Sequence, residues 1–430
     1  MNKNYKIGSR TAMALVISSM VGTGVFTSLG YQLASVQNTW TIIILWVLGG
    51  FIALIGAFTY AELGTHFKGN GGDYVFLSRT FHPILGYLYA WTSLTVGFSA
   101  PVAIAALAMA EYLGNPLGLE GYAEYLGIGV ILLMAVVHSN SLKTSSLFQD
   151  ISSLFKVLFV IVLIIIGMTY APEVTPAFNY DSSWTTELWM PGFAVSLIYV
   201  TYAYQGWNQA AYIIDEINEP KKNIPIALIG GTLIVMLIYV GLQLVMLKHG
   251  TVEQLAGEAD VTTISFANIL GEQGVLWISV CIAIQLIATI SSYVWIGARI
   301  TQAMAAEHPL WTYLSVKNDA NIPVRAIWFQ TIISVSLVVF VSLEQVMFYA
   351  GFILQLMSSF SIAVVFFITP KEGAFRSPGG RVLQVIYILF SIVVLGYTFT
   401  ERPFESAAGV LLLVVGLLTY FIKRGESSKI

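Results

Sequence analysis

Charge is scarce in this chain. Its 430 residues include 20 Lys and Arg and 23 Asp and Glu, so 10% of the chain is charged, whereas soluble proteins average about 25%. Hydrophobic residues make up 57%. So few charged side chains cannot cover the surface of a water-soluble fold of this length. The composition therefore excludes water as the main solvent and indicates a membrane protein.

Cysteine, basic clusters and metal-binding patterns are also missing. Cys281 is the only cysteine, which excludes a disulfide framework within the chain. The net charge is −3 and no basic block occurs, so nothing in the sequence favours nucleic-acid binding. We expect no metal, because the five histidines lack the spacing of a zinc site: His66, His82, His138, His249 and His308.

The motifs of an ATP-driven or catalytic protein are absent as well. No Walker-type phosphate loop occurs, so nothing in the sequence indicates ATP binding, and we expect no cofactor. No nucleophile and base occur together with supporting context, so we expect no enzyme. Cys281 lies among apolar residues and is expected to be a small core side chain.

Long charge-free stretches are what the sequence has in abundance. A helix needs about 20 mainly apolar residues to cross a hydrocarbon core of about 30 Å. We therefore predict an all-α membrane protein with about twelve transmembrane helices, of which the two shortest tilt or extend past their flanking charges. The stretches are 11–61 (two crossings), 80–110, 125–142, one ending at 172, 188–214, 223–247, 273–298, 326–343, 345–370, 382–400 and 406–422.

The positive charges favour one orientation. With these crossings, 17 Lys and Arg fall on the side of the chain ends, only Lys248 and Arg402 fall opposite, and Lys156 lies inside a span. Because cytoplasmic loops are enriched in Lys and Arg, we expect both termini in the cytoplasm. The first span is no cleavable signal peptide, since a second apolar span follows at once. The expected location is the plasma membrane, in the manner of a prokaryotic inner-membrane protein.

Two spans carry helix-breaking residues about midway. The first has Gly22 and Gly24 on either side of Thr23, and the sixth clusters polar residues around a glycine at 202–208. Glycines also allow helices to pack closely, which is the alternative interpretation. Because the first and sixth spans correspond in two five-helix halves, the breaks instead predict inverted repeats with a binding site at the midplane. We predict a single membrane domain, 1–430, with repeats 11–170 and 188–368 and two additional helices at 382–422.

Broken helices indicate a zwitterionic ligand. The N–H groups that begin a half-helix attract an anion, and unwound carbonyls attract a cation. We expect a carboxylate on the N–H groups of Thr23 and Gly24 and an ammonium on carbonyls near Met20, Tyr202 and Ala203. Gln205, Trp207 and Asn208 could then shape a pocket for the ligand's side chain. The candidate substrate-binding residues are Met20, Val21, Gly22, Thr23, Gly24, Tyr202, Ala203, Gln205, Gly206 and Asn208.

A lysine is drawn into the fifth span. The apolar stretch 157–172 is too short to cross the membrane unless the helix extends back through Lys156. The ammonium could then snorkel to the interface or point inward. An inward ammonium could occupy the place of a Na⁺ beside the broken first helix, or it could exchange protons.

Several motifs together resemble those of the amino acid-polyamine-organocation (APC) permeases. Residues 22–26 are similar to the family's first-helix glycine motif, and 60–64 with 71–74 to the end of its second helix and the following loop. The run 202–208, followed by 215–225, resembles its sixth-helix region. Within the family, the chain is similar to the bacterial relatives of the L-type amino acid transporters, and the similarity runs from about residue 10 to 341.

This resemblance implies a LeuT-type fold, with ten helices in two inverted halves plus two more, and transport of L-amino acids. It also implies that Tyr202 is an aromatic gate over the substrate. Lys156 aligns with a fifth-helix lysine that some members use in place of Na⁺. Tyr239 matches a family tyrosine that helps to hold the first-helix break.

Two departures from the family pattern change what we expect. Gln205 stands where a smaller or acidic residue is usual, which affects the size and polarity of the substrate. The loop 114–121 lacks the cysteine that joins eukaryotic members to a glycoprotein, so we expect no disulfide-linked subunit.

We therefore predict a Na⁺-independent transporter of small or medium neutral L-amino acids that works by alternating access. It is either an exchanger, in which Lys156 carries a fixed charge, or a proton symporter, in which Lys156 titrates. A membrane receptor that senses amino acids without transporting them is a further alternative. Three carboxylates near cytoplasmic span ends either gate the inner vestibule or are simply solvated: Glu62, Asp215 and Glu216.

Overall fold

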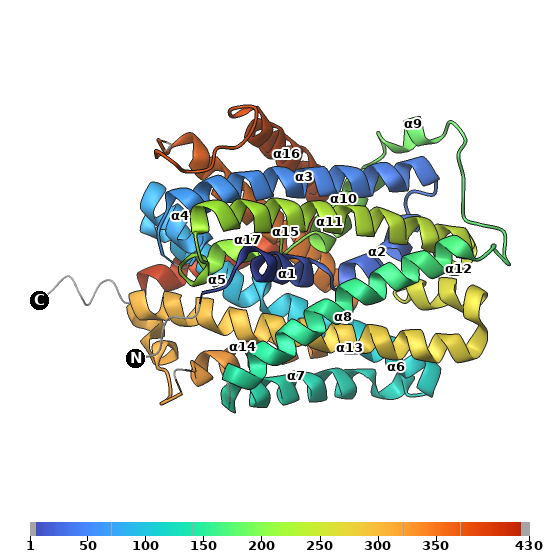
Figure 1. The fold of residues 1–430 in the computed structure, drawn as a ribbon, viewed down its shortest axis with the longest axis horizontal. Coiled ribbons are helices and arrows are strands. Elements are labelled where there is room, and N and C mark those ends of the chain that lie inside the picture. Colours follow the sequence, from blue (N-terminus) through green and yellow to red (C-terminus); the bar gives the residue numbers. More distant parts are fainter. Residues whose placement is uncertain (1–5, 70, 141, 321, 370, 423–430) are drawn as a thin grey trace, which may run out of the picture.

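The protein is described from a computed structural model that covers residues 6–69, 71–140, 142–320, 322–369 and 371–422. Within these residues the chain is almost entirely helical, and the one β-bridge joins Ile7 to Ile217. Most long helices run roughly parallel in one elongated bundle (Figure 1). The first described helix, α1, begins and the last, α17, ends toward the same end of the bundle (Figure 1), as an even number of crossings requires.

The predicted count of about twelve helices is confirmed. Eight described helical segments are long and apolar enough to cross a membrane. Shorter apolar segments within α8, α10, α14 and α17 complete the twelve, and a fifth such segment, Val261–Gly271, forms the first part of α13. In chain order the crossings are α1 (Ser9–Met20) with α2 (Thr23–Leu33), α3 (Thr39–His66), α5 (Pro83–Thr92) with η1 (Ser93–Gly97) and α6 (Ser99–Leu117), α7 (Ala123–Asn140), α8 (Leu142–Thr169), α10 (Pro191–Ala203), α11 (Pro220–His249), α13 (Val261–Glu307), α14 (Val324–Phe340), α15 (Leu343–Ala363), α16 (Val382–Glu401) and α17 (Pro403–Phe421).

Short helices connect the crossings. They are α4 (Asp73–Thr80), η2 (Glu120–Tyr122), α9 (Trp184–Glu187), η3 (Gln209–Tyr212), η4 (Ile214–Glu216), α12 (Val252–Leu255), η5 (Pro309–Ser315) and η6 (Val364–Phe366). Of these short helices, α4 lies at one end of the bundle, and α9 and α12 lie toward the opposite end (Figure 1).

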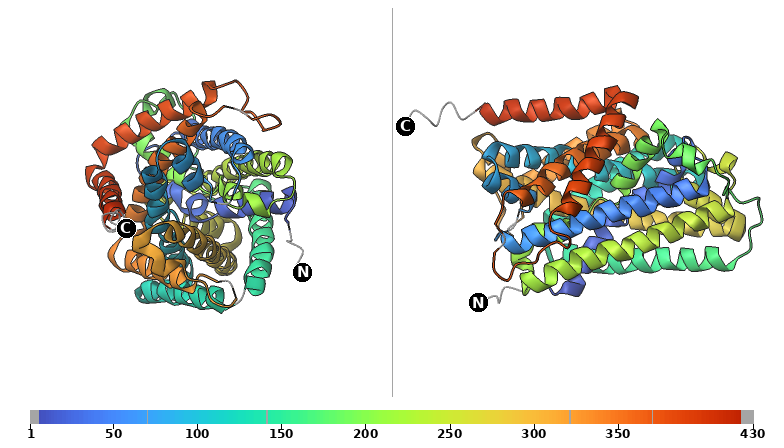
Figure 2. Two further views of the ribbon diagram at one scale, coloured as in Figure 1. Left: turned by 90° about the vertical axis from the view of Figure 1, so that its left-hand side faces the viewer. Right: turned by 90° about the horizontal axis from the view of Figure 1, so that it is seen from above.

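The first and sixth crossings are both interrupted, as predicted. In the first, α1 ends at Met20 and α2 begins at Thr23. In the sixth, α10 ends at Ala203 and the chain turns before the short helix η3. These interrupted helices lie inside the bundle, because α1 packs against α11 and α8 while α2 packs against α10 (Figure 1). The helices α16 and α17 lie at the periphery (Figure 2).

The fifth crossing extends through the lysine, as its length requires. A single helix, α8, runs from Leu142 to Thr169 and contains Lys156 near its middle. Elsewhere the structure extends the predicted spans, and α13 continues to Glu307, beyond the predicted end at 298. The boundaries of the two repeats at 170 and 188 stay a prediction.

Candidate functional site at the helix breaks

The first break leaves backbone groups of two half-helices without helical partners. Val21 and Gly22 have extended backbone conformations between α1 and α2. The N–H groups at the start of α2 and the carbonyls at the end of α1 therefore face the gap between the half-helices. The positive end of the α2 dipole lies at Thr23, and this residue is almost completely buried. The break thus offers donors to an anion and acceptors to a cation.

The second break turns the chain against the first. Gly206 has a φ of +106°, and a Cβ at this position would lie 2.7 Å from the backbone carbon of Ser19. Both the left-handed conformation and the lack of space therefore require glycine. Gly24 is also restricted, because a Cβ there would lie 2.5 Å from Cα of Ala203. Close packing and helix interruption, which the sequence presents as alternatives, occur here together.

Tyr239 on α11 ties the two breaks together. Its hydroxyl lies 2.5 Å from the carbonyl oxygen of Met20 and 3.1 Å from that of Ala203, the last residues of α1 and α10. The ring is fully buried and packs against Trp46 and Tyr204. One turn further along α11, Gln243 donates to the carbonyl of Val25. The same face of α11 thus supports the ends of both half-helices.

A small cavity of about 20 Å³ lies between the two breaks. Seven candidate residues line it: Met20, Gly22, Thr23, Gly24, Tyr202, Ala203 and Gln205. A single water needs about 10–15 Å³, so an amino-acid-sized ligand would fit only after the surrounding helices separate. The cavity therefore describes a closed arrangement of the site.

Three candidate residues lie behind the cavity wall instead. The Val21 carbonyl turns away and accepts a hydrogen bond from Lys156. Gly206 packs against the backbone of Ser19, and the Asn208 side chain donates to the Tyr212 hydroxyl. Trp207, expected to shape the pocket, packs against the ring of Tyr60. These positions support the wall without forming its surface.

Four lining residues were missed from the sequence: Ser19, Pro101, Thr289 and Tyr293. Pro101 follows the π-turn η1 in α6, and a proline within a span is a signal that could have marked it. Thr289 and Tyr293 lie one turn apart on α13, and the Tyr293 hydroxyl lies 3.3 Å from the carbonyl of Ser19. A threonine and a tyrosine within a long apolar helix carry no comparable signal.

Lys156 is completely buried and points inward, toward the first break. Its ammonium donates to the carbonyls of Ser18 (3.2 Å) and Val21 (3.1 Å) and to the hydroxyl of Thr289 (2.7 Å). Three donors thus meet three neutral oxygens, which uses all the N–H groups of a lysine. The two salt bridges found among the described residues lie elsewhere, at Glu62 and Glu344. Lys156 therefore connects α8 to the break and to α13 without a counter-charge.

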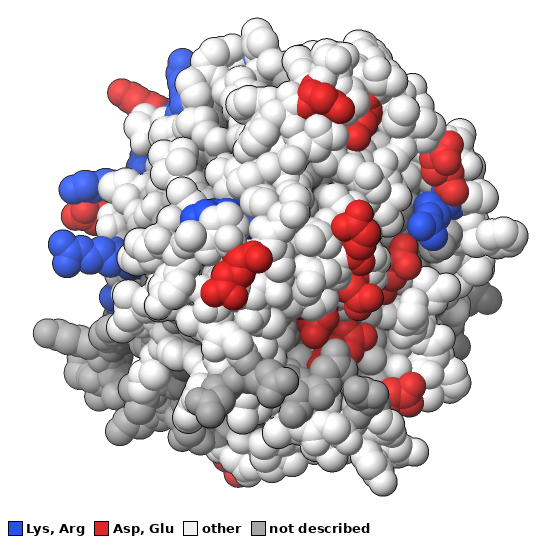
Figure 3. Space-filling view, turned by 90° about the vertical axis from the view of Figure 1, so that its right-hand side faces the viewer, with Lys and Arg blue, Asp and Glu red and all other residues white. Residues whose placement is uncertain are grey.

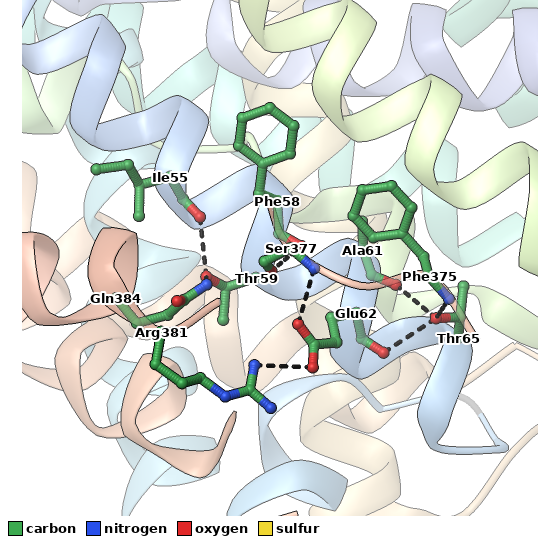
Figure 4. Close-up of polar contacts among 10 residues, drawn as sticks. All are labelled: Ile55, Phe58, Thr59, Ala61, Glu62, Thr65, Phe375, Ser377, Arg381 and Gln384. Carbon is green, nitrogen blue, oxygen red and sulfur yellow. Dashed lines mark hydrogen bonds and ion pairs between the residues drawn. The ribbon is translucent and has the colours of Figure 1, made fainter. Parts of the chain in front are cut away.

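Glu62 on α3 is buried, so the solvated interpretation is wrong for this residue. Its carboxylate pairs with Arg381 at 2.8 Å and accepts a hydrogen bond from the backbone N–H of Ser377 (Figure 4). The segment that precedes α16 is thereby held against α3 (Figure 4). Asp215 is exposed, and the side chain of Glu216 lies outside the described residues.

Comparisons with known proteins match this architecture. The family model for amino acid permeases matches residues 7–422, beyond the range to which the sequence motifs extend. The b(0,+)-type amino acid transporter 1 of Mus musculus is 26% identical over 97% of this chain and 87% of its own length. The large neutral amino acids transporter small subunit 2 of Homo sapiens is 23% identical over 97% of this chain and 80% of its own length. Amino acid transporter protein 6 of Caenorhabditis elegans is 24% identical over 98% of this chain and 83% of its own length. The chain is a multi-pass membrane protein that belongs to the amino acid permease family.

Proposed function

We propose that the protein is a Na⁺-independent transporter that exchanges small or medium neutral L-amino acids by alternating access. The observation that carries this proposal is the pair of helix breaks that meet at one cavity, with both half-helix ends held by Tyr239. A zwitterion matches the donors and acceptors that this arrangement offers.

The substrate's two charged groups would bind at opposite sides of the cavity. The carboxylate would accept hydrogen bonds from the N–H groups of Thr23 and Gly24, at the positive end of α2. The ammonium would donate to carbonyls at the ends of α1 and α10, near Met20 and Ala203. Tyr239 already uses these carbonyls, but a carbonyl oxygen can accept two hydrogen bonds.

The walls around the substrate's side chain favour a small, neutral one. The rings of Tyr202 and Tyr293 and the half-buried amide of Gln205 line the same cavity. None of the described residues that line it carries a carboxylate, so this part of the wall has no partner for a cationic side chain. The Tyr202 ring would gate the substrate.

Independence from Na⁺ rests on Lys156. The ammonium lies among two carbonyls and a hydroxyl at the first break, which is the kind of oxygen set that coordinates Na⁺ in transporters with broken helices. A fixed positive charge there would stabilise the break in every state, which suits an exchanger. Proton symport is the second candidate, and the missing counter-charge favours it, because a buried lysine without one can release its proton.

Uptake of labelled alanine into proteoliposomes separates these modes. We expect uptake only when unlabelled amino acid is inside, and equal uptake in Na⁺ and K⁺ media. Uptake into empty vesicles driven by a pH gradient would instead indicate a symporter. Binding with neither kind of uptake would indicate a receptor, and a strict requirement for Na⁺ would contradict the role proposed for Lys156.

We further propose that both termini are cytoplasmic and that the membrane is the plasma membrane. Acidic residues gather on the face opposite the chain ends, where few Lys and Arg occur (Figure 3), in agreement with the positive-inside rule. No disulfide-linked subunit is expected, because Cys281 lies within α13 and the loop 114–121 has no cysteine. Protease access to a C-terminal tag in oriented vesicles tests the orientation.

A further inference from the structure

Asp73 is another buried ionisable residue, and it is not among the residues that line the cavity. It begins the helix α4, directly after two glycines, and its side chain is completely buried. Gly72 has a φ of +49°, and a Cβ there would lie 2.6 Å from the ring of Tyr212. The N–H of Gly71 donates to the carbonyl of Tyr212. The glycines therefore allow α4 to start in contact with η3, which follows the second break, and Asp73 lies against Tyr212 of η3.

Hydroxyl groups from separate elements surround the carboxyl group of Asp73. Tyr60 on α3 donates to one oxygen, and Tyr212 on η3 donates to the other at 2.6 Å. Tyr89 on α5 lies 2.5 Å from the Tyr212 hydroxyl, and Ser361 on α15 lies beside the carboxyl group. Asp73 thus joins the sixth crossing to α3, α5 and α15.

Among the described residues, no Lys, Arg or His pairs with this carboxyl group. The titratable groups around it are the phenols of Tyr60, Tyr89 and Tyr212, with Tyr387 on α16 within the range of its charge. Both salt bridges of the described chain involve other carboxylates. Burial raises the pKa of the Asp73 carboxyl above its ordinary value, and the hydroxyl donors offset this effect only in part.

The hydroxyl cluster is connected to the cavity through aromatic side chains. Phe98 packs edge-on against Tyr212 and also contacts the ring of Tyr293, which lines the cavity. Asn208, in the unwound part of the sixth crossing, donates to the Tyr212 hydroxyl. The rings of Phe98, Tyr212 and Tyr293 are all buried. A continuous row of packed side chains thus runs from the Asp73 carboxyl group through Tyr212 and Phe98 to the cavity.

We propose that Asp73 is a proton-binding residue of the transport cycle, which takes up a proton when the cytoplasmic side closes and releases it when that side opens. This rests on the proposed function and on the proposed orientation. Opening the site toward the cytoplasm would separate η3 from α4 and α5, because the Tyr212 hydroxyl is bonded to Asp73 and Tyr89. Water then reaches the carboxyl group, and its proton leaves to the cytoplasmic solution. On closing, the carboxylate loses that water and takes a proton back.

The direction of the pH effect follows from this exchange. The closed arrangement binds the proton more tightly than the hydrated one, so acid stabilises the closed arrangement. As pH rises through the raised pKa of the closed form, the ionised carboxylate favours opening. This gives an inner gate that opens more readily at higher cytoplasmic pH. Lys156, bound at the other side of the break, takes no part in this gate.

Thiol labelling of the full chain without amino acid tests the proposal apart from transport. The native thiol is first removed by Cys281→Ser, and Gln205→Cys then places a reporter in the cavity wall. An impermeant maleimide is applied to the cytoplasmic face of inside-out vesicles between about pH 6 and about pH 8. Rates are divided by those of a matched protein with Arg376→Cys, an exposed position that corrects for the pH dependence of thiol chemistry.

We expect the corrected labelling rate to increase about tenfold as pH rises, which is the scale of one hydrogen bond to a buried charge. Asp73→Asn, which keeps the shape but cannot ionise, should label slowly at every pH. Asp73→Ala removes the carboxylate that accepts hydrogen bonds from Tyr60 and Tyr212, so this variant should be labelled fast at every pH. Tyr212→Phe removes one donor to the carboxylate and should move the rise to higher pH.

Two results would overturn the proposal. In one, the Asp73→Asn protein shows the same increase of corrected labelling rate with pH as the reporter protein that keeps Asp73. In the other, the Asp73→Ala protein is labelled no faster than that reporter protein. Loss of amino acid uptake, with the expected pH dependence of the labelling rate, would instead contradict the proposed exchange but not the proposed role of Asp73. Thermal unfolding in detergent identifies any variant that fails to fold, and the pH shift of Tyr212→Phe then decides.

Discussion

Two lysines in this protein make the same number of hydrogen bonds in very different places. Lys156 donates to Ser18, Val21 and Thr289, and Lys248 donates to three carbonyls at the end of α8, those of Gly167, Met168 and Tyr170. Lys156 is completely buried, whereas Lys248 is only half-buried. Lys248 caps the end of a helix, as a lysine near a C-terminus commonly does. The comparison shows that hydrogen-bond count alone does not mark a functional lysine.

Surroundings make the difference between the two. Two of the carbonyls that Lys248 binds belong to exposed residues, Met168 and Tyr170, and the carbonyl of Gly167 also accepts a hydrogen bond from His249. Those that Lys156 binds belong to the first break, where the Lys156 side chain is completely buried. An orphaned buried acceptor costs about 1–3 kcal/mol, so only Lys156 is essential to its neighbours.

The largest effect is therefore expected from Lys156→Ala. It orphans the carbonyls of Ser18 and Val21 at the break, and we expect alanine uptake to fall about 100-fold, the equivalent of about 2.7 kcal/mol. Lys248→Ala is the matched control and should keep uptake within about two-fold, because water replaces its donors. Full uptake by the Lys156 variant would remove this lysine from the mechanism.

The second prediction concerns the contact of α2 with α10. Gly24→Ala places a methyl group 2.5 Å from Cα of Ala203, so the half-helices must separate and the carboxylate site is displaced. We expect uptake to fall about tenfold or more, since overpacking costs about 1–3 kcal/mol. Gly396→Ala on α16 is the control, because nothing lies within 4 Å of that position. Equal uptake by the two variants would contradict the close approach at Gly24.

These predictions also separate what the sequence could predict from what it could not. Glycines mark a helix break locally, so both breaks and the extension of the fifth span through Lys156 were predictable from residue type and span length, whereas the direction of the ammonium was left open. Pro101, Thr289 and Tyr293 reach the cavity only through the packing of α6 and α13 against the break. Their place depends on contacts between distant segments, which composition and periodicity do not record. For the same reason, Asn208 was expected in the pocket but turns toward Tyr212.

Asp73 illustrates the same limit. The glycines at 71 and 72 are visible in the sequence as part of a motif, but the burial of the carboxyl group depends on hydroxyls from α3, α5 and η3. An aspartate between two spans would ordinarily be solvated. Its unusual position follows from the tertiary contact of Gly72 with Tyr212.

A third, intermediate effect is expected at the hydroxyl that joins the breaks. Tyr239→Phe keeps the ring packing against Trp46 but removes the hydrogen bonds to Met20 and Ala203. The loss of a net hydrogen bond of about 1 kcal/mol should lower uptake about five-fold and lower thermal stability slightly. Tyr397→Phe, at an exposed position on α16, controls for the loss of a hydroxyl. Unchanged uptake would mean that packing alone holds the breaks.

The smallest effect on rate, and the sharpest on selectivity, is expected at Gln205. Its half-buried amide lines the cavity with the rings of Tyr202 and Tyr293, so Gln205→Ser should enlarge the space for the substrate's side chain. One methylene in a hydrophobic pocket changes selectivity by about 10-fold or more, so leucine should gain on alanine by about that factor in competition for uptake. Thr201→Ser, a neighbour on α10 that does not line the cavity, is the matched control. An unchanged preference in the Gln205 variant would place the substrate's side chain elsewhere, against α6 and Pro101.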